Sequence, residues 1–222
     1  MYTAKAGDVN ENPVTGERGV VRLGAHESLD GRGVYELSVR PGGAVVGEHI
    51  HPIIEERFTV QRGWVGFRIN GQESVAQVGV QMTVPPGVAH DWWNAGDEEA
   101  HVLIEVRPAA RFEEAIADLF GLAQDGKTNA KGMPNLFQTA LFAREYADVL
   151  YFTKPPRWVQ QLLFAVLAPI ARLLGYRGSY PEYRNRPRPR IEVEPWSDSH
   201  AYAAGAPSEK GNSSDVNNAS LQ

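Results

Sequence analysis

The sequence contains no cysteine among its 222 residues. Disulfide bonds, thiolate metal sites and cysteine nucleophiles are therefore excluded, and a metal ion would need nitrogen and oxygen ligands. The N-terminal residues contain no apolar run behind Lys5, so they do not resemble a secretory signal, and we expect a cytoplasmic protein. The net charge of −5 gives no general support for binding to nucleic acid.

Short runs of strand-forming residues, separated by glycine and proline, fill the chain from residue 20 to residue 108. The candidate strands are Gly33–Val39, Ala44–His51, Glu55–Gln61, Trp64–Asn70, Val75–Val78, Gln81–Val84, His90–Asn94 and Ala100–Val106. The pair Asn70 and Gly71 suits a tight type I′ hairpin, because both central positions of that turn need positive φ. This pattern predicts a small β-barrel or sandwich, preceded by an N-terminal arm at residues 1–19.

The hydrophobic period changes after the strands, and residues 109–182 are expected to form a helical extension. Apolar residues recur there at helical spacing, and Gly126 and a pair of prolines separate three helices. The third helix, Trp158–Leu174, is apolar nearly all round, and we expect Pro169 to kink it. Residues 183–222 begin with a basic strip and continue as a polar tail, which we expect to be largely disordered.

Two histidines in the first half of the chain are placed to begin a chelating site. His49 and His51 are separated by one residue, so on a strand their side chains point to the same side. A short turn then brings Glu56 back on a neighbouring strand, where Phe58 shares its face. Glu55 is the competing carboxylate, although the shared face with Phe58 favours Glu56.

A second segment adds a third histidine. The turn at Pro86-Gly87 would direct the next strand, and His90 with it, towards the interior of the barrel. Trp92 follows two residues later and would share this inward face. It would either line a pocket or pack within the barrel.

These residues match the two motifs that define the cupin family. The first motif is satisfied at Gly43, His49, His51, Glu56 and Gly63, and the second at Gly79, Pro85, Gly87, His90 and Asn94. The sequence therefore resembles a bacterial-type single-domain cupin over a third to a half of its length. The resemblance implies a mainly β fold, a jelly-roll barrel, with a C-terminal α-helical extension that the family pattern does not cover.

The resemblance also implies a metal set of His49, His51, Glu56 and His90. Three imidazoles and one carboxylate suit one divalent transition ion, which would be Fe, Mn, Ni, Co, Cu or Zn. Four protein ligands on a six-coordinate ion would leave two positions for water, O₂ or substrate. The alternative is a barrel that matches the motifs and works without metal.

The function implied is that of a metal-dependent enzyme acting on a small organic molecule, first of all a quercetinase-like dioxygenase or other O₂-using oxidoreductase. Glu56 would be catalytic as a base, and Phe58 and Trp92 would contact the substrate. A metal-dependent isomerase or lyase is the alternative, as is a non-catalytic module that binds a small ligand. Cupin barrels often pair through their outer strands, so we expect a homodimer.

A basic segment at residues 153–190 stands out in this acidic chain. It contains eight basic residues and a single acid, Glu182. The third helix within it is too short and too interrupted to span a membrane. It would pack on the protein or on a second subunit, or lie in a membrane interface, where the cations would be drawn to anionic lipid. The strip Tyr183–Arg190 by itself is expected to be an extended, solvated strand.

Overall fold

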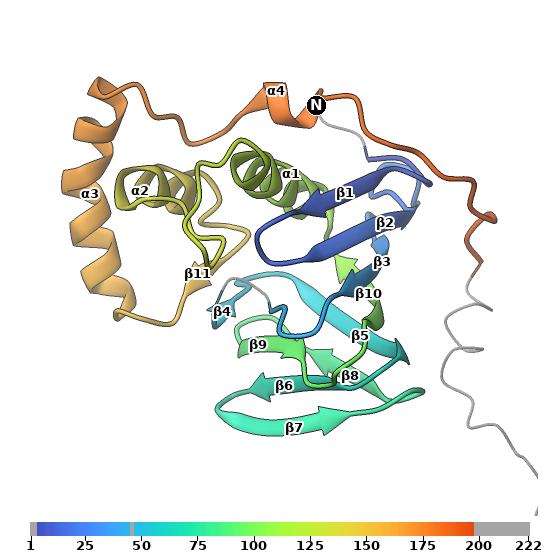
Figure 1. The fold of residues 1–222 in the computed structure, drawn as a ribbon. Coiled ribbons are helices and arrows are strands. Elements are labelled where there is room, and N and C mark those ends of the chain that lie inside the picture. The colour runs from blue at the N-terminus through green and yellow to red at the C-terminus, as the bar shows by residue number, and fades with distance from the viewer. Residues whose placement is uncertain (1–3, 45–46, 198–222) are drawn as a thin grey trace, which may run out of the picture.

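Two antiparallel sheets form the centre of the molecule (Figure 1). The structure is a computed structural model that describes residues 4–44 and 47–197. The first sheet has the strand order β1 (Val9–Asn12), β2 (Glu17–Leu23), β3 (Gly33–Val39), β10 (Ala100–Arg107), β5 (Glu55–Arg62) and β8 (Gln81–Val84). The second has the order β11 (Tyr151–Phe152), β4 (His49–Ile50), β9 (Ala89–Asn94), β6 (Val65–Ile69) and β7 (Gln72–Ala76). The mainly β fold expected from the sequence is confirmed.

Alternation along the strands places one set of side chains between the two sheets. In β9, His90, Trp92 and Asn94 are buried, while the residues between them are only half-buried. Phe58 and Phe67, from β5 and β6, meet them in the core. The hairpin between β6 and β7 turns at Asn70 and Gly71 with φ of 50° and 76°, which confirms the expected turn.

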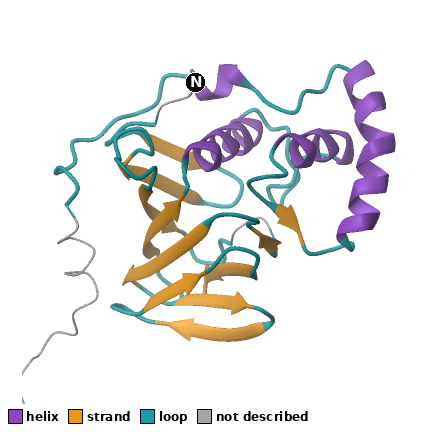
Figure 2. Ribbon diagram, turned by 180° about the vertical axis from the view of Figure 1, so that it is seen from behind, coloured by secondary structure: helices purple, strands orange, loops and turns teal. Residues whose placement is uncertain are grey.

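The helices lie together on one side of the strands (Figure 2). They are α1 (Ala110–Gln124), α2 (Leu136–Glu145), α3 (Arg157–Leu173) and the short α4 (Pro181–Arg184). The expected C-terminal helical part is therefore confirmed. Phe112 and Ala115 of α1 pack against the barrel core, and so do Phe142 of α2 and Tyr146 just after it. The side chain of Asn135 caps α2 by accepting a hydrogen bond from the backbone N–H of Gln138.

Three strand boundaries differ from the sequence prediction. The expected N-terminal arm contains β1 and the start of β2, which pair with each other and extend the first sheet. The sequence of β1, in which Asn10, Glu11 and Asn12 are among the paired residues, is too polar to show the alternation of a strand. The long strand expected at Ala44–His51 is only the two-residue β4, and β7 ends at Ala76 rather than beginning near Val75. Helix α3 continues through Pro169, and the kink expected at that residue stays a prediction.

The basic strip is not a solvated strand, and the described part of the expected disordered tail is held against the fold. Three of its arginines make ion pairs at 2.9–3.3 Å with acids of α1, its C-terminal end and the N-terminal region. The pairs are Arg184 with Glu114 and Asp118, Arg186 with Asp125, and Arg190 with Asp8. The sequence pattern could not reveal these acids, because they lie far away along the chain. Residues 198–222 of the expected tail lie outside the described residues.

Candidate metal centre

Four side chains from neighbouring strands converge at one end of the barrel. His49 on β4 is paired in register with His90 on β9, and Glu56 comes from β5. The Nε2 atoms of His49 and His51 are 3.2 Å apart. One oxygen of Glu56 lies 2.8 Å from His90 Nε2 and 3.4 Å from His51 Nε2. All four ligand atoms lie within 4.8 Å of one another, so the expected convergence is confirmed.

The three histidine rings are oriented by hydrogen bonds on their far sides. Each Nδ1 lies against a backbone carbonyl, which is Gly47 O for His49 (3.0 Å), Val149 O for His51 (2.6 Å) and Val88 O for His90 (3.1 Å). A carbonyl oxygen only accepts, so each Nδ1 carries a proton. In a neutral ring Nε2 is then left with a lone pair. The Nε2 atoms face one another and the carboxylate of Glu56, an arrangement that is favourable only when a metal ion or protons lie between these atoms.

The donor set therefore fits a divalent transition ion. Separations of 2.8–3.4 Å suit neighbouring ligands around an ion bonded at about 2.1 Å. Burial, together with the charges of His51 and His90, lowers the pKa of His49 to about 3, which keeps this ring neutral. Burial opposes ionisation of Glu56, but the charges and hydrogen bonds of His51 and His90 outweigh it and hold the pKa of this carboxyl below its usual range. Burial also opposes protonation of His51, but the charge and hydrogen bond of Glu56 outweigh it and raise the pKa of His51, so a metal ion would replace a proton held between these two groups. Neutral imidazole and ionised carboxylate are the ligand forms that metals need.

Three of the four candidate ligands line a partly open cavity of about 150 Å³. His49, His51 and Glu56 form part of its wall, and most of the remaining lining is apolar. Phe112 from α1 and Phe142 from α2 are among the residues that cover it. Residues of α1 and α2 thus form part of the cavity wall beside the candidate metal centre, and Figure 1 shows both helices on one side of the strands.

The two residues expected to contact substrate occupy different positions. Trp92 lines the cavity and also packs within the barrel, with its ring centroid 6.0 Å from that of Phe58. Phe58 is buried in the core, and the described residues that line the cavity do not include it. Its ring lies 6.5 Å from that of His90, so its position supports the site from behind the cavity wall. Substrate contact remains a prediction for Trp92.

The extension also contributes to the ligands themselves, which sequence reasoning missed. Besides the Val149 carbonyl that orients His51, β11 pairs with β4 and places Phe152 opposite His49. Thr153 donates a hydrogen bond of 2.6 Å to a carboxylate oxygen of Glu48 at the start of the same strand. These contacts join residues about a hundred positions apart, and the main ones use backbone atoms, so no sequence motif could have indicated them.

Two buried carboxyl groups in the cavity wall were also missed. Burial raises the pKa of Glu17 to about 7, although a hydrogen bond from Thr15 opposes the shift. Glu113 is buried too, and its Oε1 accepts hydrogen bonds from the hydroxyl of Tyr35 and the backbone N–H of Ala25. Both acids lie in segments of mixed polarity, so their burial has no periodic signal. Besides the candidate metal ligands, these two carboxyl groups are polar groups in a cavity wall that is otherwise mostly apolar.

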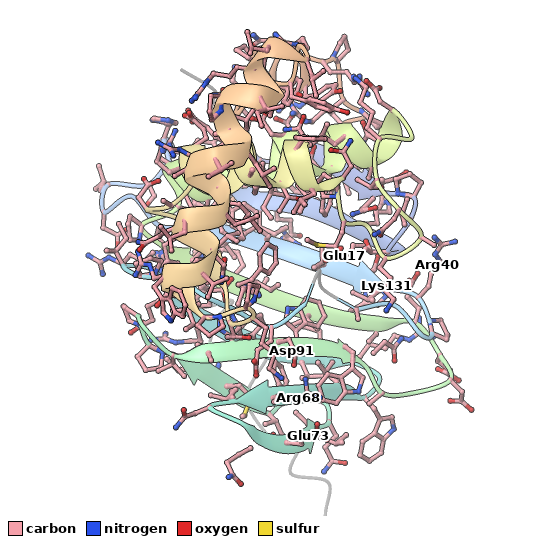
Figure 3. The ribbon with its side chains drawn as sticks, turned by 90° about the vertical axis from the view of Figure 1, so that its left-hand side faces the viewer. Glu17, Arg40, Arg68, Glu73, Asp91 and Lys131 are labelled. Atoms are coloured by element: carbon pink, nitrogen blue, oxygen red, sulfur yellow. The ribbon has the colours of Figure 1, made fainter. Side chains whose placement is uncertain are left out.

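An open cleft adjoins the cavity on the side where α3 lies. Arg68 and Asp91 of the second sheet line it, and Leu163 of α3 lines it from the opposite side. Figure 3 shows Arg68 and Asp91 beside each other on neighbouring strands of that sheet. The cleft and the cavity share Met133, Thr139 and Phe152 in their walls, so the two spaces lie next to each other.

Residues 35–106 match the family described as Cupin domain, whereas no curated protein matches the sequence. Among solved structures, the chain is similar to a putative sugar phosphate isomerase from Acidithiobacillus ferrooxidans, with 21% identity and a TM-score of 0.36. That similarity covers 40% of this chain and 58% of the other, so this chain spans less than two thirds of that protein.

Two further solved structures are similar over 46% of this chain and 68% of their own, with a TM-score of 0.38. They are a sugar phosphate isomerase of the cupin superfamily from Silicibacter pomeroyi, at 23% identity, and a polyketide cyclase from Streptomyces resistomycificus, at 17%. At these scores the similarities carry no argument about activity. The family match, however, spans both motifs and all four candidate ligands. Residues 35–106, about a third of the chain, therefore form a cupin domain.

Proposed function

We propose that the chain is a metal-dependent enzyme that acts on a small, largely apolar organic molecule. The observation that carries this proposal is that three of the four candidate ligands line a partly open and mostly apolar cavity. An ion held by the four side chains would supply a Lewis acid and, if redox-active, a path for electrons from the substrate to O₂.

The volume of the cavity limits the size of the substrate. An apolar cavity of about 150 Å³ is large enough for one benzene ring. A three-ring flavonol exceeds this volume unless the covering helices move, which disfavours the quercetinase-like substrate that the sequence suggested. A single-ring molecule with two neighbouring oxygens, or a short-chain equivalent, fits both the volume and a metal centre that binds oxygen atoms.

The side chains around the cavity indicate two reaction classes. Trp92, Phe112 and Phe142 would exclude water from the substrate, which favours an oxidoreductase that uses O₂ on a bound organic molecule. Glu56 lies in the same wall, and its carboxylate would accept a proton from the substrate. This position favours a metal-dependent isomerase or lyase as the second candidate, because proton removal by a carboxylate needs no oxidant.

The test follows O₂ and substrate together. The full chain is loaded anaerobically with Fe(II), Mn(II), Ni(II), Co(II), Cu(II) or Zn(II), and 4-methylcatechol is added as a single-ring probe. We expect O₂ consumption matched by loss of the probe for at least one redox-active ion, and loss of turnover in Glu56→Gln. The neighbouring Glu55→Gln is the matched control and should keep its activity, because Glu55 points away from the ligand cluster.

The other outcomes separate the alternatives. Conversion of small hydroxylated or keto-acid probes without O₂ consumption would replace the oxidoreductase by an isomerase or lyase. Tight binding of the probe with no conversion under any ion would contradict an enzyme and support a non-catalytic ligand-binding module.

A further inference from the structure

Helix α3 turns its most hydrophobic face away from the protein. Six of its large apolar side chains are between 38% and 88% exposed, namely Trp158, Leu162, Leu163, Val166, Ile170 and Leu173. Four of these, at positions 158, 162, 166 and 173, recur at helical spacing and share one side of the helix. The helix stands at the edge of the molecule beyond α2, as Figure 1 shows.

The side of α3 that faces the protein carries a single large apolar residue, Phe164, beside small and polar ones. Ala168 and Ala171 pack against Leu141 of α2, and the buried Gln160 donates hydrogen bonds to two backbone carbonyls. Small residues allow the two helices to approach closely, so the narrow inner face is sufficient to hold α3 in place. The outward apolar face is therefore a fixed feature of the fold, and a monomer in water gains nothing from it.

Unpaired cations accompany this face. From Lys154 to Pro181 the sequence contains no acidic residue. Lys154 and Arg157 lie exposed at the N-terminal end of α3, and Arg172 lies exposed in its last turn. Within residues 4–44 and 47–197, none of these three makes an ion pair, whereas Arg177 and three arginines of the basic strip are paired with acids. The two ends of the apolar face therefore carry positive charge that no acid of the described residues neutralises.

We propose that α3 docks the protein onto an anionic lipid surface, lying parallel to it with the exposed apolar face in the headgroup region. An apolar face about 25 Å long with cations at its ends matches the chemistry of such a surface. Trp158 at one end is a side chain that favours the membrane interface. Among the described residues, no helix is long and apolar enough to cross a bilayer, which agrees with attachment rather than spanning.

Charge argues against a second copy of the chain as the occupant of this face. Two copies of α3 packed antiparallel would bring Arg157 of each against Arg172 of the other. A parallel pair would bring each cation against its own equivalent. No acid on α3 offsets the repulsion in either arrangement. An anionic lipid surface meets both the apolar face and the cations at once.

Docking through α3 would also place the open cleft near the lipid. Leu163 belongs both to the exposed face and to the wall of the cleft that adjoins the cavity. If the proposed function holds, an apolar substrate would pass from the membrane through this cleft to the metal centre. The docking itself does not depend on that function, since it needs neither metal nor turnover.

The test is co-sedimentation of the full chain with two kinds of vesicle, phosphatidylcholine alone and phosphatidylcholine with about one third phosphatidylglycerol. We expect binding to the anionic vesicles that weakens as salt is raised. The triple variant Leu162→Gln, Val166→Gln, Leu173→Gln should lower the partition coefficient at least about tenfold. The matched control is Ile53→Gln, Val75→Gln, Val78→Gln, which removes three equally exposed apolar side chains elsewhere and should bind like the original chain.

A charge variant tests the second half of the proposal. Each of Lys154→Gln, Arg157→Gln and Arg172→Gln should weaken binding to anionic vesicles by about fivefold. Circular dichroism and thermal unfolding establish that every variant is folded. Failure to bind either vesicle, or binding unaffected by the α3 variants, would overturn the proposal. So would a dimer, measured by light scattering, that dissociates in the α3 triple variant. Because the assay runs equally well on metal-free protein, its result is independent of the proposed enzyme activity.

Discussion

Helices α1 and α3 are both rich in apolar residues, but α1 packs these residues on the barrel core whereas α3 exposes most of them to solvent. In α1, Phe112 and Leu119 pack towards the barrel core and line the cavity. In α3, Leu162 and Val166 face solvent, and the inner side carries Gln160, Ala168, Ala171 and one large apolar residue, Phe164. Hydrophobicity by itself therefore does not decide which helix becomes part of the core. What decides is which side of the helix packs against a neighbouring element.

The comparison separates two roles of the helical extension. Its inner part lines the cavity and orients His51 through the carbonyl of Val149. Its outer part leaves apolar surface in water. Covering that surface with lipid would be favourable by about 25 cal/mol for each Å² removed from water. The helical extension thus supplies part of the cavity wall and also, in α3, the proposed docking surface.

The largest expected effect is a pH-dependent change in stability caused by Glu17 in the cavity wall. Burial raises the pKa of Glu17 from 4.5 to about 7, so the folded state holds this proton more tightly than the unfolded state. The resulting stabilisation is fully present below pH 4.5 and is lost as the pH rises through 7. The shift corresponds to about 3 kcal/mol in the free energy of unfolding. Urea unfolding at acidic and at mildly alkaline pH should show this loss, and Glu17→Gln should remove most of it.

The control for this prediction is Glu11→Gln, on the adjacent strand and exposed to solvent. It should leave the pH dependence of unfolding unchanged. An unaltered pH dependence in Glu17→Gln would mean that Glu17 is not held protonated inside the fold.

The contrast between the two sides of α3 can be tested within one helix. Ala168 is fully buried against α2, so Ala168→Leu forces extra volume into a packed contact and should cost about 1–3 kcal/mol of unfolding free energy. Ala165→Leu makes the same change at an exposed position and should cost almost nothing. Chemical unfolding measures both. Equal effects of the two substitutions would show that the inner face has been assigned to the wrong side.

A smaller effect is expected where α3 is attached to the segment before it. The side-chain amide of Gln160 donates to the carbonyls of Phe152 and Pro155, at 2.7 and 2.6 Å. Gln160→Ala leaves both carbonyls without this partner and should cost about 1–2 kcal/mol. Gln161→Ala, one residue further and exposed, should stay within about 0.5 kcal/mol of the original chain. If both variants have the same unfolding free energy, the hydrogen bonds of Gln160 contribute nothing to stability.

The sequence predicts the ligand set because the information is local. The spacing of His49 and His51 on one strand, with Glu56 and His90 in fixed motif positions, is enough to bring four side chains together. The strand and helix regions follow equally from hydrophobic period, apart from short or polar strands such as β1.

The sequence does not predict what the extension does. The contact between His51 and Val149 joins residues 98 positions apart through a backbone carbonyl, which has no residue type to recognise. The acids that pair with Arg184 and Arg190 also lie far away along the chain, so the sequence by itself predicts a solvated strip. The outward turn of α3 depends on packing against α2, which a helix that is apolar all round does not reveal.

The central claim is that the four converging side chains hold a metal ion, and elemental analysis tests it most directly. The full chain is purified without chelator or histidine tag and compared with two variants. One is the double variant that combines His49→Ala and His51→Ala, and the other is His101→Ala, which alters a histidine outside the cluster. We predict about one equivalent of a divalent transition metal in the original chain and in His101→Ala, and none in the double variant, whose barrel stays folded. Absence of metal even after anaerobic reconstitution, or full occupancy in the double variant, would contradict the account.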